Sequence, residues 1–221
     1  MTDRLPAAVL WDMDGTLVDT EPYWIACEFA LVARHGGTWS TEHAHALVGN
    51  DLHTSARYIQ EHGGVPLPPE EIIDILLDGV VERVRADVPW RPGARELLRD
   101  LVALRVPNAL VTMSYQRLAA TVVDVLPAGS FAVQVTGDQV AHGKPHPDPY
   151  ETAARRLGVD PGECVAIEDS PSGLASARAA GVPVLAVQHL VDLTRHTTGP
   201  VLSTLEGVSP YDLLPLLVAP L

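Results

Sequence analysis

Short apolar segments alternate with amphipathic ones along most of this chain. Five apolar segments are candidate strands, at Ala8–Asp12, Ala109–Thr112, Val133–Thr136, Val165–Glu168 and Val184–Val187. They are short and show no strict alternation, which is typical of strands that are buried on both faces. The amphipathic segments between them predict helices at Gly93–Leu104, Tyr115–Leu126, Pro149–Leu157 and Ser172–Ala180. This order predicts an α/β fold in which helices flank a parallel sheet.

The segment from about residue 21 to residue 86 contains no candidate strand. It predicts four helices, at Glu21–His35, Thr41–Val48, Leu52–His62 and from Pro68 onward. In the first of these, Ile25, Phe29 and Val32 form an apolar stripe, and Trp24, Cys27 and Leu31 lie beside it. We therefore expect a four-helix cap at residues 20–87, inserted into a core made of residues 1–19 and 88–221. The expected hinges are Val18–Pro22 and Asp87–Pro92, and a short helix is expected near Tyr211–Val218.

Composition and charge narrow the function further. The chain has 221 residues, 47% of them apolar, and a net charge of −13. That charge argues against binding nucleic acid, which needs clustered Lys and Arg. No signal peptide or membrane span is expected, and two cysteines in different elements suggest neither a disulfide framework nor a zinc site. We therefore expect a cytoplasmic protein without a membrane or nucleic-acid partner.

The strongest chemical signal is Asp12-Met13-Asp14-Gly15-Thr16-Leu17, at the end of the first predicted strand. Residues i and i+2 of a strand point the same way, so both carboxylates can face a pocket at the carboxyl edge of the sheet. One carboxylate can then attack a substrate while the other moves a proton. The alternative is an acidic turn with Gly15 at positive φ. A calcium loop is excluded because Thr16, Leu17 and Val18 interrupt the ligand spacing.

Three further groups follow other predicted strands or precede helices. Thr112 and Ser114 suit a phosphate, or alternatively cap the next helix. Lys144 lies in a proline-rich loop, where a fixed cation would bind phosphate and keep a nucleophile ionised, although a solvated lysine is the commoner fate. Glu168 and Asp169 could bind Mg²⁺ together with Asp12. The alternative is that Asp169 or Ser170 is the N-cap of the next helix. The histidines are expected at the surface or in packing.

Taken together, four motifs occur in a fixed order between about Ala8 and Val187. They are Asp12-x-Asp14-Gly15-Thr16-Leu17-x-Asp19-Thr20-Glu21, then Thr112, then Lys144-Pro145-x-Pro147-Asp148, then Glu168-Asp169-Ser170 with Gly173. This set resembles the haloacid dehalogenase-like phosphatase superfamily, in the branch with an α-helical cap that contains phosphatases and β-phosphoglucomutase. The resemblance implies a Rossmann-like core, Mg²⁺ as cofactor and a small phosphorylated metabolite as substrate.

The resemblance also implies a role for each matched residue. Asp12 would be the nucleophile that forms an aspartyl phosphate, and Asp14 the general acid and base. Phosphate would bind Thr112, Lys144 and the backbone N–H groups of Met13, Asp14 and Met113, with Ser114 as a further candidate. The implied Mg²⁺ ligands are Asp12, the Asp14 carbonyl, Glu168 and Asp169.

Other functions remain to be weighed. A phosphomutase of this branch carries a histidine in the place of Trp24 and a valine in the place of Thr16, so both residues favour hydrolysis. A dehalogenase would lack Asp14, and a phosphorylated receiver domain has its acids in another order and no helical cap. The turn at residues 47–51, with Gly49 and Asn50, is the candidate specificity loop. The nearest polar helpers there are Arg57 and His53, and so few basic groups disfavour a second anionic group on the substrate.

Overall fold

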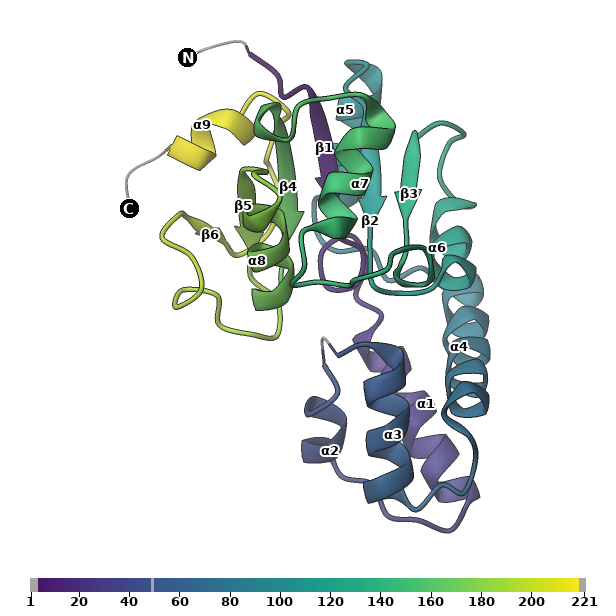
Figure 1. The fold of residues 1–221 in the computed structure, drawn as a ribbon. Coiled ribbons are helices and arrows are strands. Elements are labelled where there is room, and N and C mark those ends of the chain that lie inside the picture. The colour runs from purple at the N-terminus through teal and green to yellow at the C-terminus, as the bar shows by residue number, and fades with distance from the viewer. Residues whose placement is uncertain (1–3, 49, 219–221) are drawn as a thin grey trace.

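A computed structural model describes residues 4–48 and 50–218. In that part of the chain the strands form one parallel sheet in the order β3-β2-β1-β4-β5-β6 (Figure 1). Their bounds are β1 (Ala8–Trp11), β2 (Asn108–Val111), β3 (Val133–Val135), β4 (Cys164–Glu168), β5 (Val184–Val187) and β6 (Val201–Leu202). The predicted α/β fold is therefore confirmed. The sequence reading missed β6, which is only two half-buried residues long at the sheet edge.

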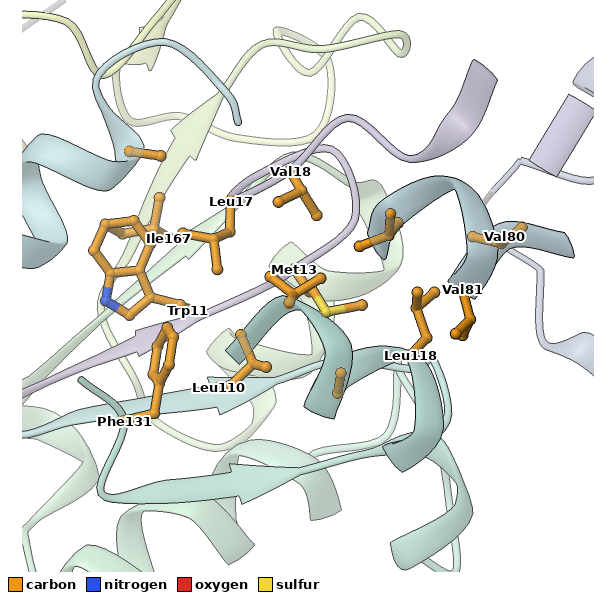
Figure 2. Close-up of a cluster of buried hydrophobic side chains, with 14 of the residues drawn as sticks. Trp11, Met13, Leu17, Val18, Val80, Val81, Leu110, Leu118, Phe131 and Ile167 are labelled. Atoms are coloured by element: carbon orange, nitrogen blue, oxygen red, sulfur yellow. The ribbon is translucent and has the colours of Figure 1, made fainter. Parts of the chain in front are cut away.

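Strand β1 lies at the centre of the sheet and is completely buried. It pairs with β2 on one side and β4 on the other, so that Leu10 has Ala109 and Ala166 as neighbours. Its side chains alternate between the two faces. Trp11 belongs to the larger apolar cluster, part of which Figure 2 shows, and its Nε1 donates a hydrogen bond of 2.9 Å to Asn108 Oδ1. Leu10 packs on the opposite face with Tyr150.

Helices cover both faces of the sheet. Apolar side chains of α7 (Asp148–Leu157) and α8 (Pro171–Ala179) pack on the Leu10 face. Those of α5 (Ala94–Ala103), α6 (Gln116–Val123) and α9 (Leu213–Val218) pack on the Trp11 face. Two short 3₁₀ turns, Gly137–Gln139 and Pro161–Glu163, complete the connections. The side chains follow the two-sided burial that parallel strands require.

The inserted helices lie beyond the carboxyl ends of the central strands (Figure 1). They are α1 (Glu21–Arg34), α2 (Thr41–His45), α3 (Leu52–Gly63) and α4 (Pro69–Ala86). Helix α4 joins the two parts, because Val80 and Val81 share one apolar cluster with Leu118 of α6 and Met13 (Figure 2). An ion pair between Asp78 and Arg117 links the same two helices at the surface. The division at residues 20–87 stays our working prediction.

The stripe expected along the first cap helix is wrong at one position. Phe29 is 37% exposed. The buried side of α1 is instead formed by Cys27, Glu28, Leu31 and Val32. Helix α1 packs against α4 and α3, and its residues Cys27, Leu31 and Val32 belong to the buried apolar cluster, whereas Phe29 does not. A carboxyl group on a buried helix face is unusual and bears on the site described below.

The two expected hinge segments lie side by side as a short ribbon. Val18 pairs with Trp90. The Asp19 N–H donates to the Pro89 carbonyl at 2.8 Å, and the Arg91 N–H donates to the Leu17 carbonyl at 3.0 Å. The two chain segments that connect the core to the inserted helices are therefore hydrogen-bonded to each other where they leave the core. Among the described residues, no helix is long and apolar enough to cross a membrane.

Candidate active site

The carboxyl ends of three adjacent strands open into one cavity of about 370 Å³ between the sheet and the inserted helices. Asp12 directly follows β1, Thr112 directly follows β2, and Asp169 directly follows β4. Asp14 and Lys144 line the same cavity. The structure therefore brings the predicted carboxylates, hydroxyl and cation to one place, as expected for ligand sites of open α/β sheets.

Asp12 has two carboxylate oxygens in different situations. Oδ1 accepts a hydrogen bond of 2.6 Å from Lys144 Nζ. Oδ2 is buried and has no hydrogen-bond partner among the described residues. The pKa of Asp12 is raised to about 7. Burial is the largest cause and outweighs the attraction of Lys144, which lowers the pKa, while the negative charge of Glu168 contributes to the rise. An unpartnered buried carboxylate oxygen is costly unless a ligand or ion meets it.

Lys144 is the cation that holds these acids together. Its side chain is only 4% exposed, and Nζ donates to Asp12 Oδ1 and Glu168 Oε1 at 2.6 Å each and to the Val111 carbonyl at 2.9 Å. Burial alone would lower the pKa of this ammonium, but the attraction of Asp12 and Glu168 raises it above its usual value. The alternative of a solvated lysine is therefore wrong, and Lys144 stays charged.

Glu168 is held by several donors. Its Oε1 accepts from the Tyr150 hydroxyl at 2.6 Å, in addition to Lys144, and its Oε2 accepts from Ser170 Oγ at 3.1 Å. Ser170 is also the N-cap of α8, because its side chain accepts from the Gly173 N–H at 3.0 Å. The capping reading therefore holds for Ser170, while Asp169 remains available to a ligand. Tyr150 was missed from the sequence because an aromatic residue on a buried helix face is typical of the core.

The acids Asp12, Glu168 and Asp169 fit a hard divalent cation. One oxygen from each lies within 4.8 Å of the others. Burial raises the pKa of Asp169 well above its usual value, and the charges of Asp12 and Glu168 add to this effect. A Cβ at position 15 would lie 2.0 Å from Asp169 Oδ2 and would clash with it, so the position of the Asp169 carboxylate requires glycine at residue 15. Three carboxylate groups, one of them with the unpartnered oxygen Asp12 Oδ2, suit Mg²⁺, which prefers oxygen ligands of this kind.

Asp14 faces hydroxyl groups rather than the other acids. Its Oδ2 accepts from Ser114 Oγ at 2.7 Å and from Thr112 Oγ1 at 3.2 Å, and its Oδ1 accepts from Thr20. Neither Thr112 nor Ser114 caps the following helix, since the Gln116 N–H bonds to Asp138 instead. The Asp14 carboxylate is not part of the three-acid group. The expected role of its carbonyl as a metal ligand stays a prediction.

Backbone donors are also available at this site. In the described part of the chain, the N–H groups of Met13, Asp14 and Met113 have no hydrogen-bond partner. Met13 buries its side chain in the core, and Met113 uses its sulfur to accept from the Lys144 N–H at 3.2 Å. The side chains thus fix the loops while the N–H groups stay free, which suits the oxygens of a phosphate.

The cap half of the cavity differs in part from expectation. Asn50 lines the cavity, together with Leu47 and Val48. Its amide also donates to the Ala46 carbonyl at 3.0 Å. Gly49, the other predicted specificity residue, lies outside the described residues. His53 and Arg57 are exposed and do not line the cavity.

Polar residues to which the sequence assigned no role also line the cavity, among them Glu28, Ser55 and His189, and so does Glu21, the last residue of the first motif. Glu28 carried a usable signal, since it interrupts the apolar side of its helix. His189 was expected at the surface or in packing, but its side chain is only 9% exposed and its Nε2 lies 3.3 Å from Asp19 Oδ1. Burial and the charge of Arg91 lower the pKa of His189.

Comparisons with known proteins agree with this geometry. Residues 9–187 match the family model described as haloacid dehalogenase-like hydrolase. The chain is 35% identical over 185 residues to a phosphorylated carbohydrates phosphatase of Thermotoga maritima, covering 79% of this chain and 82% of that one. It is 32% identical to hexitol phosphatase A of Escherichia coli, covering 84% and 85%. The structure of CbbY from Rhodobacter sphaeroides with phosphate superimposes with a TM-score of 0.81 at 27% identity, covering 95% and 100%.

Gly173 leads to a first prediction. A Cβ at this position would lie 1.9 Å from the Glu168 carboxyl carbon, so Gly173→Ala should displace Glu168 and weaken its contact with Lys144. We expect phosphate release to fall about 10- to 100-fold, because Glu168 would lose the position from which it accepts from Lys144 in the cavity wall. Gly199→Ala is the matched control, because its Cβ would meet only Thr197 Oγ1 at 3.5 Å. Equal activity of the two variants would contradict this role of Gly173.

Glu28 leads to a prediction about pH. Burial raises its pKa from 4.5 to about 8, partly opposed by the Trp39 indole N–H. Between pH 4.5 and pH 8, Glu28 is ionised in the unfolded state but stays protonated in the folded state. The free energy of unfolding therefore has its full contribution from Glu28 below pH 4.5 and loses it as the pH rises to 8. Glu28→Gln should therefore gain stability over the wild type with rising pH, by about 5 kcal/mol at most at pH 8 relative to pH 4.5. Urea unfolding at both pH values measures this, and a pH-independent difference would contradict it.

Proposed function

Because this chain belongs to the haloacid dehalogenase-like hydrolase family and is a phosphatase, we propose that it is a Mg²⁺-dependent phosphomonoesterase using an aspartyl phosphate on Asp12. The substrate we propose is a small phosphorylated metabolite of the sugar or polyol type. The observation that carries the mechanism is the asymmetry of Asp12, with Oδ1 on Lys144 and Oδ2 buried without a partner. Two buried free cysteines, Cys27 and Cys164, are consistent with a reducing compartment such as the cytoplasm.

In the first proposed step, Asp12 Oδ2 attacks the phosphorus atom and the bond to the leaving oxygen breaks. The phosphoryl group moves to Asp12, and the leaving alkoxide takes a proton from Asp14. The free N–H groups of Met13, Asp14 and Met113 and the ammonium of Lys144 offset the phosphoryl charge. The Asp14 carboxyl group accepts from Thr20, which lies in the expected hinge segment Val18–Pro22, so a movement of that segment would release it toward the leaving group.

Asp12, Glu168 and Asp169 would hold Mg²⁺, with the Asp14 carbonyl as a further ligand. When bound, the cation supplies charge compensation that lets a phosphate dianion approach a group of carboxylates. Without it, the raised pKa values of Asp12 and Asp169 describe a site with too much negative charge for its burial. Tyr150 and Ser170 keep Glu168 in place by donating to its two oxygens.

In the second proposed step, water attacks the phosphorus atom of the aspartyl phosphate, and Asp14 takes the proton from that water. The Asp12–phosphoryl bond breaks and inorganic phosphate leaves, so Asp12 returns as a carboxylate. Between the steps the inserted helices must admit water after excluding it. The paired hinge segments at Val18 and Trp90 form the point about which such an opening would occur.

Asp12→Asn tests the nucleophile. This variant should release phosphate from an aryl phosphate at least about 1,000-fold more slowly with Mg²⁺, because an amide oxygen is a poor nucleophile. Asp124→Asn, at an exposed carboxylate outside the cavity, is the control and should keep wild-type activity. Unchanged turnover of Asp12→Asn would overturn its assignment.

Removal of divalent cations tests the cofactor. Chelation with EDTA should abolish phosphate release by the wild type, and added Mg²⁺ should restore it, because the three acids would repel the substrate when no cation is bound. Circular dichroism before and after chelation checks that the fold persists. Full activity in EDTA after exhaustive dialysis would sink the proposed metal requirement.

Incubation with a hexose 1-phosphate and the matching 1,6-bisphosphate separates hydrolysis from phosphomutase activity. We expect release of inorganic phosphate and little isomerisation, because Trp24 occupies the position of the mutase histidine and Thr16 that of its valine. Phosphorus NMR follows both reactions in one sample. Efficient isomerisation with little phosphate release would show that the chain is a mutase.

A further inference from the structure

The half of the cavity formed by the inserted helices carries acidic and hydroxyl groups but no cation. Glu21, Trp24 and Glu28 line it from α1, and Ser55 lines it from α3. Among the described residues, no Lys, Arg or His of the inserted helices lines the cavity. Carboxyl groups therefore lie on both sides of the cavity, but Lys144 accompanies them only on the sheet side.

The helix side is built by one face of α1. Glu21, Trp24 and Glu28 are spaced i, i+3 and i+7, so they lie above one another on the same side of the helix. Trp24 is half-buried, which leaves part of its ring toward the cavity. An aromatic face flanked by carboxyl groups offers apolar contact and polar contact to the same ligand.

Two polar side chains there are largely buried but keep an accessible polar atom. Glu28 is 4% exposed, and its one hydrogen bond among the described residues is accepted by Oε2 from Trp39 Nε1 at 3.3 Å. Ser55 is 7% exposed as a residue, and it lines the cavity. Glu28 Oε1 and Ser55 Oγ are not among the fully buried polar atoms that lack a partner, so both atoms are accessible in the cavity and can meet the hydrogen-bonding groups of a ligand.

Protonation makes these groups suited to hydroxyls. Burial raises the pKa of Glu28 to about 8 and that of Glu21 to about 7, where the charges of Asp14 and Asp19 add to the effect. A protonated carboxyl group both donates and accepts, as does the hydroxyl of Ser55. Each can therefore pair with an alcohol, whereas a second phosphate or a carboxylate would meet carboxyl groups and no opposing cation.

We propose that Trp24, Glu28 and Ser55 bind the leaving group and select an uncharged, hydroxyl-bearing one, so that phosphate monoesters of polyols or sugars are preferred over bisphosphates and phosphorylated acids. This inference rests on the proposed phosphatase function and adds to it three specificity-determining residues and the exclusion of a second anionic group. A cavity of about 370 Å³ is at the small end of ligand sites, which fits a leaving group of a few carbon atoms beside a phosphate.

The test compares the kcat/KM of five substrates with Mg²⁺ present. They are a hexitol 6-phosphate, the matching hexitol 1,6-bisphosphate, a 2-amino-2-deoxyhexitol 6-phosphate, phosphoglycolate and para-nitrophenyl phosphate. The wild type should prefer the hexitol monophosphate over the bisphosphate and phosphoglycolate by about 100-fold or more, because unpaired polar groups reject a mismatched ligand strongly. A comparable kcat/KM for the bisphosphate, or a higher one for the aminated substrate, would overturn the proposed class.

Variants test the named residues. Ser55→Ala and Glu28→Leu should each lower the ratio of kcat/KM for the hexitol monophosphate to that for para-nitrophenyl phosphate by about 10-fold, mainly through KM. Arg57→Ala, on the exposed side of the same helix as Ser55, should leave the ratio unchanged. Should Glu28→Leu not fold, Ser55→Ala decides alone, and an unchanged ratio there would overturn the inference.

The outcomes for the two proposals are distinguishable. A wild type that releases no phosphate from any of the five substrates with Mg²⁺ would refute the proposed function itself. Turnover of para-nitrophenyl phosphate that depends on Asp12, combined with no preference for the hexitol monophosphate, would refute only the inference about the leaving group.

Discussion

The buried ammonium of Lys144 between Asp12 and Glu168 is the interaction on which this site depends. Its side chain is 4% exposed and donates to both carboxylates at 2.6 Å, so a charged group that burial penalises is stabilised by two opposite charges. Removing either partner would leave a buried charge without compensation. The same contact joins the loop after β3 to the ends of β1 and β4, and it orients Asp12 so that its other oxygen is free.

The two sides of the cavity, formed by the sheet and by the inserted helices, differ in their charged groups. On the sheet side, three acids and one lysine form a site that a divalent cation would complete. On the helix side, Glu28 and Ser55 line the cavity, and no Lys, Arg or His of the inserted helices joins them in the part of the chain that the structure describes. The phosphate and its leaving group would therefore meet opposite chemistries, and the ribbon through Val18 and Trp90 connects the two sides.

Much of the sheet side could be predicted from sequence because its residues are tied to strand ends. Asp12, Thr112 and Glu168 each follow or end a short apolar segment, and parallel strands bring their carboxyl ends to one edge. Tyr150 and Asp138 could not be found in this way. Tyr150 looks like a core aromatic until its hydroxyl is seen to meet Glu168, and Asp138 caps a helix that lies 22 residues earlier in the chain.

By itself, the sequence determined the order of strands and helices, the insertion after the first strand and the set of chemical groups, because periodicity and motif spacing are local properties. Only the tertiary structure decided which of these groups are buried and paired. Lys144 reaches Asp12 across 132 positions. Glu28 lies on a helix side that is buried only because α4 and α3 pack against it. Burial and pairing arise from contacts between distant segments, and these set the charges that the chemistry requires.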